Sequence, residues 1–321
     1  MKTSPSAKSG ASARKPRSHG AGVRAAASTI AGVRITHGER VVYPDARLTK
    51  RMVAEYYARV AERLLPFVAD RPLAIVRCPD GLNAECFFQK HVGRYAIPGI
   101  EVFMIDESTG RNPYAIANTP HALIGLAQWN ALELHAWGST APAIDRPDTL
   151  VLDLDPDPAL AWSLVVAAAN EVRALLEAVD LAPFVKTTGG NGLHVVVPLQ
   201  RRHSWDEVKQ FAYGVALRLV ATAPDRFSAT PGEANRRGRI FVDYLRNARG
   251  ATAVAPYSLR ARPGATVATP LSWSELSAKT PPSSFTLTSV PGRLRRKDPW
   301  ADYGARRQRL GAKALRAVAS R

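Results

Sequence analysis

The sequence predicts a mixed α/β fold, and three observations support this. Short apolar runs of strand length occur around Leu150, Val185, Val195, Val242 and Ala253. Before and between them lie longer segments whose apolar residues recur every three to four positions, as on one face of a helix. Apolar residues make up 46% of the 321 residues, which is enough for one large core or two small ones.

Three segments have helical periodicity: 49–65, 158–179 and 204–222. In the first, apolar side chains recur at every fourth position: Met52, Tyr56, Val60 and Leu64. The second is strongly apolar, so we expect it to pack against a sheet. The third opens with Ser204 and Glu207 at the spacing of a capping box.

The most informative acids stand where apolar runs end. Run 149–152 leads into Asp153 and Asp155, and Pro156 follows at once. Alternate side chains of a strand share a face, so the two carboxylates would project together, and a divalent cation held by oxygen ligands commonly relieves their repulsion. Asp243 closes a second apolar run. Three acids at strand ends resemble a two-metal phosphoryl-transfer site.

The alternative is a strand terminus followed by a helix cap. Asp157 and Pro158 have the residue types preferred at an N-cap and at the first helical position. This alternative explains Asp157 but leaves two acids inside the strand unexplained.

Segment 184–198 predicts a strand, a glycine turn and a second strand. Gly189, Gly190 and Gly192 allow the backbone to turn its amides toward an anion, as phosphate-binding nests do. Thr188 would add a hydroxyl group and His194 an imidazole. The alternatives are an ordinary hairpin and a histidine satisfied within the fold.

The order of these segments resembles the archaeo-eukaryotic primase superfamily, and most closely the polymerase domain of bacterial ligase D, the enzyme of nonhomologous end-joining. The order is acid pair, helix, glycine turn, helix and lone strand acid. The likeness extends from about Ile35 to Trp300 and includes further short matches: Tyr43-Pro44, 87–91, 132–137 and 255–260.

The resemblance implies a primase-like fold for a primase-polymerase domain over 30–300. Its RRM-like catalytic palm would span 136–300 and pack on an N-terminal α/β subdomain over 30–135. The composition of 1–29, basic and rich in Ala, Ser and Gly, predicts a disordered tail. Residues 301–321 would form a basic C-terminal tail.

The resemblance also implies an activity: template-directed transfer of a nucleotide to a primer 3′-hydroxyl, with a tolerance or preference for ribonucleotides and with two Mn²⁺ or Mg²⁺ ions. Asp153, Asp155 and Asp243 would then be the catalytic residues and the metal ligands. The residues expected to bind the NTP or dNTP are Thr188, Gly189, Gly190, His194, His135, Arg236 and Arg260. For these arginines and histidines the alternative is a purely structural ion pair or hydrogen bond.

Two positions depart from the family pattern. Many relatives have Ser in place of Thr188, and Arg or Lys in place of Asn191. Threonine keeps the hydroxyl group, but Asn191 removes a cation. We expect weaker nucleotide binding or compensation by another basic residue.

Five residues are expected to contact DNA. Phe87 and Phe88 are adjacent in a predicted strand, so one ring should enter the core and the other should stack on a template base. Lys90 follows them. Arg40 and Lys50 stand where end-joining relatives bind the 5′-phosphate at a gap, although a solvated cation is the alternative for each.

The composition agrees with a polyanionic partner, because 44 Lys and Arg against 27 Asp and Glu give a formal net charge of +17. No apolar run reaches the roughly 20 residues of a membrane span, so we expect no membrane partner and a cytoplasmic, nucleoid-associated bacterial protein. Cys78 and Cys86 are too few for a disulfide framework or a four-ligand zinc site. Cys86 is therefore interpreted as a packing residue in a reducing compartment.

Three functions remain open: a polymerase at gaps or broken ends, a primase that makes primers de novo, and a noncatalytic nucleic-acid-binding module. The intact acids disfavour the third, and Arg40 and Lys50 favour the first. Because the chain lacks a Lys-x-Asp-Gly ligase signature, the family context implies that it acts with a separate DNA ligase and with the end-binding protein Ku.

Overall fold

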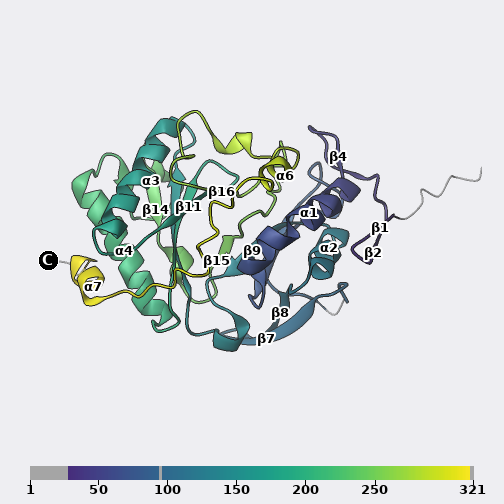
Figure 1. Ribbon diagram of the computed structural model, residues 1–321, viewed down its shortest axis with the longest axis horizontal. Helices are drawn as coiled ribbons and strands as arrows, with labels where there is room; N and C mark the ends of the chain where they lie inside the picture. Colours follow the sequence, from purple (N-terminus) through teal and green to yellow (C-terminus); the bar gives the residue numbers. More distant parts are fainter. Residues whose placement is uncertain (1–27, 94–95, 319–321) are drawn as a thin grey trace, which may run out of the picture.

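The computed structural model describes residues 28–93 and 96–318, which form two main β-sheets with helices packed against them (Figure 1). The helices are α1 Lys50–Val68, α2 Pro120–Gln128, α3 Trp162–Glu177, α4 Trp205–Thr222, α5 Glu233–Arg236, α6 Val290–Arg293 and α7 Ala312–Val318. The basic tail expected over 1–29 lies outside the described residues, except for its last two. Along the part of the chain that is described, no helix is both long and apolar enough to cross a bilayer.

The N-terminal strands are β1 Ser28–Ile30, β2 Val33–Ile35, β3 Val41–Tyr43, β4 Leu48–Thr49, β5 Leu73–Arg77, β6 Phe87–Gln89, β7 Glu101–Glu107, β8 Gly110–Ile116 and β9 Ala131–Trp137. The C-terminal strands are β10 Thr149–Pro156, β11 Phe184–Thr187, β12 Leu193–Pro198, β13 Phe227–Ser228, β14 Ile240–Asp243, β15 Thr252–Val254 and β16 Pro270–Leu271. Strands expected around Leu150, Val185, Val195, Val242 and Ala253 are therefore confirmed.

Sheet 1 has the strand order β15-β9-β5-β8-β7, and the short β6 also pairs with β5. Helices α1 and α2 pack against β9 of this sheet. Strand β15 comes from the C-terminal half of the chain, and the division expected between 135 and 136 falls inside β9. Sheet 1 is therefore built from both halves of the sequence.

Sheet 2 has the order β13-β14-β10-β12-β11-β16, antiparallel except for the pair β13 and β14. Strand β10 alternates, so that Leu150, Leu152 and Leu154 enter the core with α3 and α4. Asp153 and Asp155 consequently project from the opposite face. Burial of the leucines fixes the register of β10 and thereby the direction of the acids.

The predicted helices exist, but one of them begins later than expected. Helix α4 has the capping box of Ser204 and Glu207. Helix α3 begins at Trp162, four residues after Pro158. The Asp157 carboxylate accepts from the amides of Ala159 at 2.8 Å and Gly238 at 2.6 Å, so it closes a turn and holds a distant loop instead of capping the helix.

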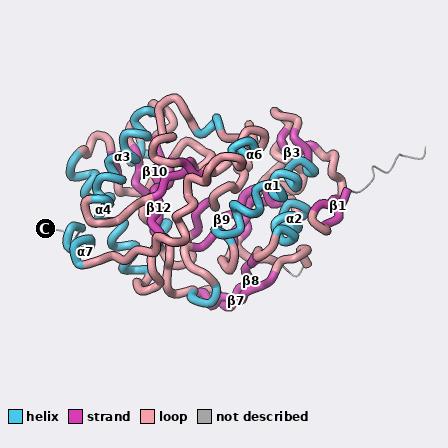
Figure 2. Tube along the Cα trace, in the orientation of Figure 1, coloured by secondary structure: helices cyan, strands magenta, loops and turns pink. Residues whose placement is uncertain are grey.

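Between β15 and α7 the chain is mostly loop (Figure 2). Trp300 and Tyr303 stack with ring centroids 5.1 Å apart and belong to an apolar cluster with Val151 and Val196 of sheet 2. Helix α7 packs against α4. Most of 301–321, expected as a tail, is therefore folded onto sheet 2.

Cys78 and Cys86 form a disulfide, which corrects the interpretation of Cys86 as a packing residue. Cys78 follows β5 and Cys86 precedes β6. The antiparallel pairing of Arg77 with Phe87 brings the two Cα atoms to 4.3 Å. The cysteines meet because β5 pairs with β6, and no local pattern predicts that pairing.

Replacing Cys86 with Ser removes a crosslink between residues eight positions apart. We expect the free energy of unfolding of the oxidised protein to fall by about 2 kcal/mol, because the unfolded chain regains the entropy of the open loop. Urea denaturation with and without a reductant measures the effect. The reductant should destabilise the wild type and leave Cys86→Ser unchanged; a wild type insensitive to the reductant contradicts the prediction.

Candidate active site

The acids lie in a row of side chains that crosses four adjacent strands of sheet 2. Lys186 on β11 pairs with His194 on β12, and His194 pairs in turn with Asp153 on β10. On its other side Asp153 pairs with Asp243 on β14. Directly paired residues of neighbouring strands share a face. Asp155 lies on the same face of β10, so the structure gathers all three acids found in the sequence.

Two arginines neutralise these acids. The Nε atom of Arg246 lies 3.1 Å from a carboxylate oxygen of both Asp153 and Asp243. Arg236, expected to bind the triphosphate, forms an ion pair with Asp155. In this conformation each of the three carboxylates therefore has a guanidinium partner.

The acids differ in their electrostatics. Burial alone would raise the pKa of Asp153, but the neighbouring His194 and the charges of Arg246 and Lys186 hold it well below its ordinary value. Burial and the charge of Asp153 raise the pKa of Asp155. Burial also raises the pKa of Asp243, and the charge of Arg246 offsets only part of this rise. A cation at the site would favour the charged form of all three.

The donor set fits hard divalent cations, because carboxylate oxygens are the ligands that Mg²⁺ and Mn²⁺ prefer. Within residues 28–93 and 96–318, no three His, Cys, Asp or Glu side chains converge as ready metal ligands. The positive charges next to these acids are the guanidinium groups of Arg246 and Arg236. These groups show that the site accommodates positive charge.

The glycine turn is closely packed. Gly189 has φ +68°, and a Cβ there would lie 2.7 Å from Cγ of Arg260. The Thr188 hydroxyl accepts from the amide of Gly190 at 3.1 Å and donates to the carbonyl of Gly192 at 3.2 Å. Thr188 therefore organises the turn itself, in addition to facing the site.

Glu133 on β9 holds two of the expected nucleotide-binding residues. One carboxylate oxygen lies 2.7 Å from Nε2 of His135 and 2.9 Å from Nε of Arg260, and the other accepts from the amide of Ala261. Arg260 also donates to the carbonyl of Thr188 at 2.6 Å. Burial alone would raise the pKa of Glu133. The hydrogen bond of His135 and the charge of Arg260 outweigh this effect and lower the pKa to about 2.

These groups surround an open pocket of about 580 Å³ that we call the acid pocket. It brings together most of the expected catalytic and nucleotide-binding residues: His135, Asp153, Asp155, Thr188, Gly190, His194 and Arg260. Asp243 and Gly189 are adjacent to this set through Arg246 and Arg260, respectively.

The sequence interpretation missed several residues of this site. Arg246 follows Asp243 by three positions, and this spacing after a strand acid was an available signal. Arg262 lines the acid pocket beside Asn191, where it can replace the cation that Asn191 lacks. Glu133 and Lys186 were not predicted either: Arg260, the partner of Glu133, lies 127 positions later, and Lys186 reaches the site through the pairing of β11 with β12.

Both phenylalanines of β6 are exposed, so the expectation that one ring enters the core is wrong. Phe87 is 39% and Phe88 50% exposed. Strand β6 pairs along one edge with β5 and is too short to be covered on either face. Arg77 stacks over Phe87 at 5.4 Å, and Phe88 meets the His135 ring edge-on at 5.5 Å.

Arg40 and Lys50 are brought together beside the disulfide loop. The Lys50 amide donates to the carbonyl of Arg40, whose guanidinium donates to the carbonyl of Pro79 and the carboxylate of Asp80. Burial and the charge of Arg40 lower the pKa of Lys50 to about 8. Lys90 is exposed beyond β6. A buried lysine that is next to an arginine is typical of an anion site.

The fold and the paired acids define a nucleotidyltransferase of the primase type. The family model described as the LigD primase-polymerase domain matches residues 49–300. The chain therefore belongs to the LigD primase-polymerase family.

Two relatives are similar to this chain over most of its length. The multifunctional non-homologous end joining protein LigD of Pseudomonas aeruginosa is 45% identical over 291 residues, 90% of this chain and 35% of that protein. The protein of the same name from Mycolicibacterium smegmatis is 36% identical over 251 residues, 76% of this chain and 32% of that protein. The chain thus spans about a third of the length of these relatives.

A solved structure has the same fold. The polymerase domain of Mycobacterium tuberculosis ligase D in complex with DNA superposes with a TM-score of 0.79 and 31% identity, and the match covers 85% of this chain and 98% of that one.

We predict that Glu133 makes stability depend on pH. Its folded pKa lies below its ordinary value of 4.5, so its contribution is complete above pH 4.5 and is lost as the pH falls toward about 2. Glu133→Gln should lose about 3 kcal/mol of unfolding free energy at pH 7 and show a flatter acid dependence. Urea denaturation between pH 3 and 7 tests this; parallel profiles for the two proteins contradict it.

Proposed function

We propose that the chain is a template-directed polymerase that adds nucleotides, preferentially ribonucleotides, to a primer 3′-hydroxyl at gaps or broken ends during nonhomologous end-joining. The observation that carries the proposal is the convergence of Asp153, Asp155 and Asp243 on one face of sheet 2, next to a glycine turn and several cations. Membership in the LigD primase-polymerase family supports it.

In this proposal Asp153, Asp155 and Asp243 hold two Mn²⁺ or Mg²⁺ ions, which supply charge neutralisation at the triphosphate and activation of the primer hydroxyl. The chain itself positions the reactants for in-line attack on the α-phosphorus. Arg236 and Arg246 keep the carboxylates ionised beforehand. Because metal ligation competes with these ion pairs, both arginines become available to phosphate oxygens when the acids bind metal.

The triphosphate would lie between the acids and the glycine turn. Arg260 and Arg262 line that side of the acid pocket, and a planar guanidinium matches phosphate oxygens. Glu133 fixes the orientation of both Arg260 and His135, so binding requires little reorganisation of either side chain.

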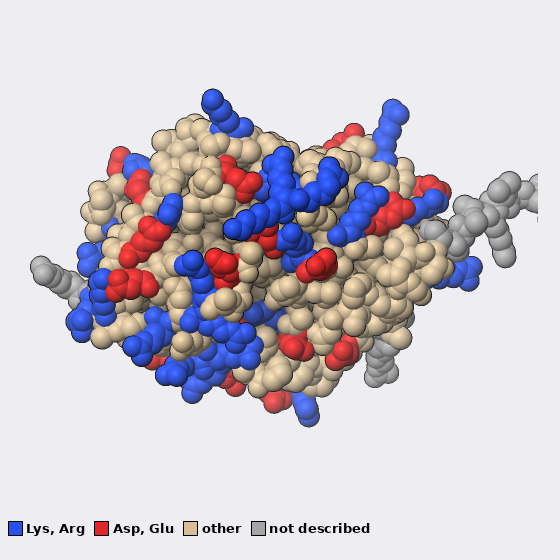
Figure 3. Space-filling view, in the orientation of Figure 1, with Lys and Arg blue, Asp and Glu red and all other residues tan. Residues whose placement is uncertain are grey.

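The DNA would approach from the side of β6. Phe88 is exposed and touches the His135 ring at the acid pocket, so a template base stacked on it would lie beside the incoming nucleotide. Arg40 and Lys50 would bind the downstream 5′-phosphate, which favours gap filling over de novo priming. On the face shown in Figure 3, Lys and Arg side chains gather in groups and do not spread evenly, as suits a polyanion.

The partners in this proposal are DNA with gaps or ends, NTP or dNTP, Ku and a DNA ligase. The multifunctional end-joining relatives support the partnership with Ku and a ligase through family context. The cytoplasm and the nucleoid would be the place of action.

The decisive activity test is primer extension on a 5′-phosphorylated gapped duplex with Mn²⁺, comparing NTP with dNTP. Asp153→Ala/Asp155→Ala should reduce addition by at least about a thousandfold, since the charge neutralisation needed for phosphoryl transfer is lost. Asp180→Asn is the matched control, because its carboxylate is exposed and forms its ion pair with Lys313 of α7, away from the acid pocket. Retained activity in the double variant contradicts the assignment of the acids.

Recognition of the 5′-phosphate has a separate test. Arg40→Ala should weaken binding to 5′-phosphorylated gapped DNA by about tenfold or more, because a charge-assisted hydrogen bond is lost, and should leave binding to the 5′-hydroxyl duplex nearly unchanged. Arg59→Ala, an exposed residue on α1, controls for the loss of one positive charge. Equal losses on both duplexes would show that Arg40 contributes only nonspecific attraction.

A further inference from the structure

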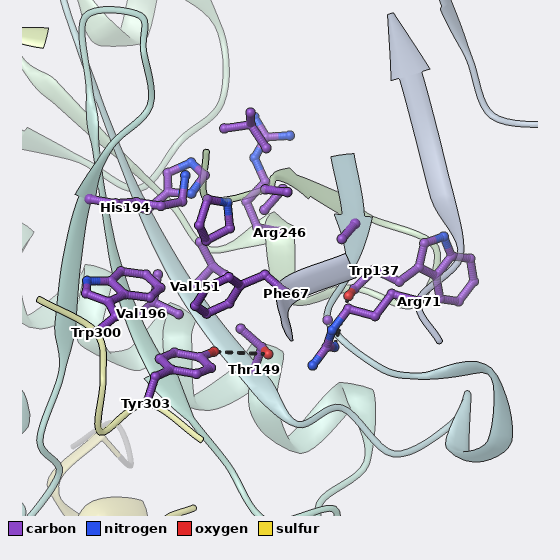
Figure 4. A pocket seen from close by; sticks show the side chains of 17 residues that line it. Phe67, Arg71, Trp137, Thr149, Val151, His194, Val196, Arg246, Trp300 and Tyr303 are labelled. Atoms are coloured by element: carbon purple, nitrogen blue, oxygen red, sulfur yellow. Dashed lines mark hydrogen bonds between the residues drawn. The ribbon is translucent and has the colours of Figure 1, made fainter. Parts of the chain in front are cut away.

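A second pocket, which we call the rear pocket, lies behind the acid pocket and contains a cavity of about 50 Å³. Its walls are mainly apolar and include Phe67, Val151, Val196 and Trp300. Figure 4 shows His194 and Arg246 at one end and Thr149 and Tyr303 at the other. His194 and Arg246 line both pockets, so they form the partition between them.

Two buried polar atoms at this partition have no hydrogen-bond partner among the described residues: Nζ of Lys186 and Nδ1 of His194. Each residue is only 2% exposed, and both line the rear pocket. Of the described residues that form its walls, none carries a carboxylate, whereas Arg71 and Arg246 add positive charge. A buried nitrogen without a hydrogen-bond partner is costly, and a small cavity faced by two such nitrogens commonly holds an ordered water.

The other ring nitrogen of His194 faces the acids. Its Nε2 lies 3.4 Å from a carboxylate oxygen of Asp153. A carboxylate can only accept, so this nitrogen carries the proton. Nδ1 of His194 then has no proton and can only accept, so a water that bridges it to Lys186 donates to Nδ1 and accepts from Nζ, which has protons to donate whether or not it is charged. Together with the contact to Asp153, such a water would fix one tautomer and one ring orientation of His194.

We propose that Lys186 is a positioning residue for Asp153: through water in the rear pocket it fixes the His194 ring, and His194 holds the carboxylate in the orientation that receives the metal. This inference rests on the proposed two-metal function. Groups that orient a metal ligand from behind commonly change metal affinity by about 10- to 100-fold when removed.

Lys186→Met separates this role from a purely structural one. Methionine has similar length and no charge, and removing a buried amino group that has no hydrogen-bond partner relieves its desolvation cost. We therefore expect Mn²⁺ binding, measured from the electron paramagnetic resonance signal of free Mn²⁺ without nucleotide or DNA, to weaken by about 10- to 100-fold. The melting temperature should stay the same or rise.

Val196→Ala is the matched control. Val196 lies two residues from His194 on β12 and lines the same pocket, but its side chain carries no polar atom. This variant should melt at a lower temperature and bind Mn²⁺ like the wild type. Unchanged Mn²⁺ affinity in Lys186→Met overturns the inference, as does an equal loss of affinity in Val196→Ala.

The tautomer gives a second test, which is made on the wild type and uses a variant only to identify the signals. In ¹⁵N-histidine-labelled wild type, His194 should carry its proton on Nε2 with Nδ1 as an acceptor, and the spectrum of His194→Gln identifies its signals. A proton on Nδ1 overturns the inference. A wild type that binds no Mn²⁺, while His194 has the expected tautomer, points instead to failure of the proposed two-metal function.

Discussion

The repulsion between Asp153 and Asp243 is the constraint on which the rest of the site depends. They are register partners in adjacent strands, so burial of the leucines of β10 forces the two carboxylates together on the opposite face. Each neighbouring group reduces that repulsion: Arg246 bridges the pair and His194 contacts Asp153 from the next strand. A site that must neutralise its own acids when free is prepared to exchange those cations for metal.

The two sheets act as one unit because buried polar groups tie them together. Glu133 in sheet 1 holds Arg260, which donates to the glycine turn of sheet 2. The hydroxyl of Tyr56 on α1 donates to the carbonyl of Tyr257, and the hydroxyl of Tyr57 accepts from the amide of Leu259. These buried hydrogen bonds would be costly to leave unmade, so separating the N-terminal part from the palm would destabilise both.

Local patterns predicted the parts of the fold that depend on neighbouring residues. Alternation in β10 was enough to place Asp153 on the face opposite the core, and helical periodicity identified the major helices. Elsewhere the prediction failed because the roles of the residues depend on contacts that are distant in the sequence. Asp157 holds a loop some eighty residues away and so does not cap its helix. Glu133 contacts Arg260, which lies 127 positions later, and no local pattern shows that contact. Phe88 is exposed because β6 is a short edge, which no local pattern shows.

The position of helix α7 matters for proteins in which this domain is one module among several. Helix α7 packs on α4, which covers the face of sheet 2 opposite the acids. Helix α7 lies at the end of the molecule beside α4, away from β7, β8 and β9 of sheet 1 (Figure 1), so a polypeptide continuing beyond Val318 would start from that side. A module fused there could move on its linker without competing for the primer terminus, so polymerisation and a second enzymatic step could take place on the same broken end.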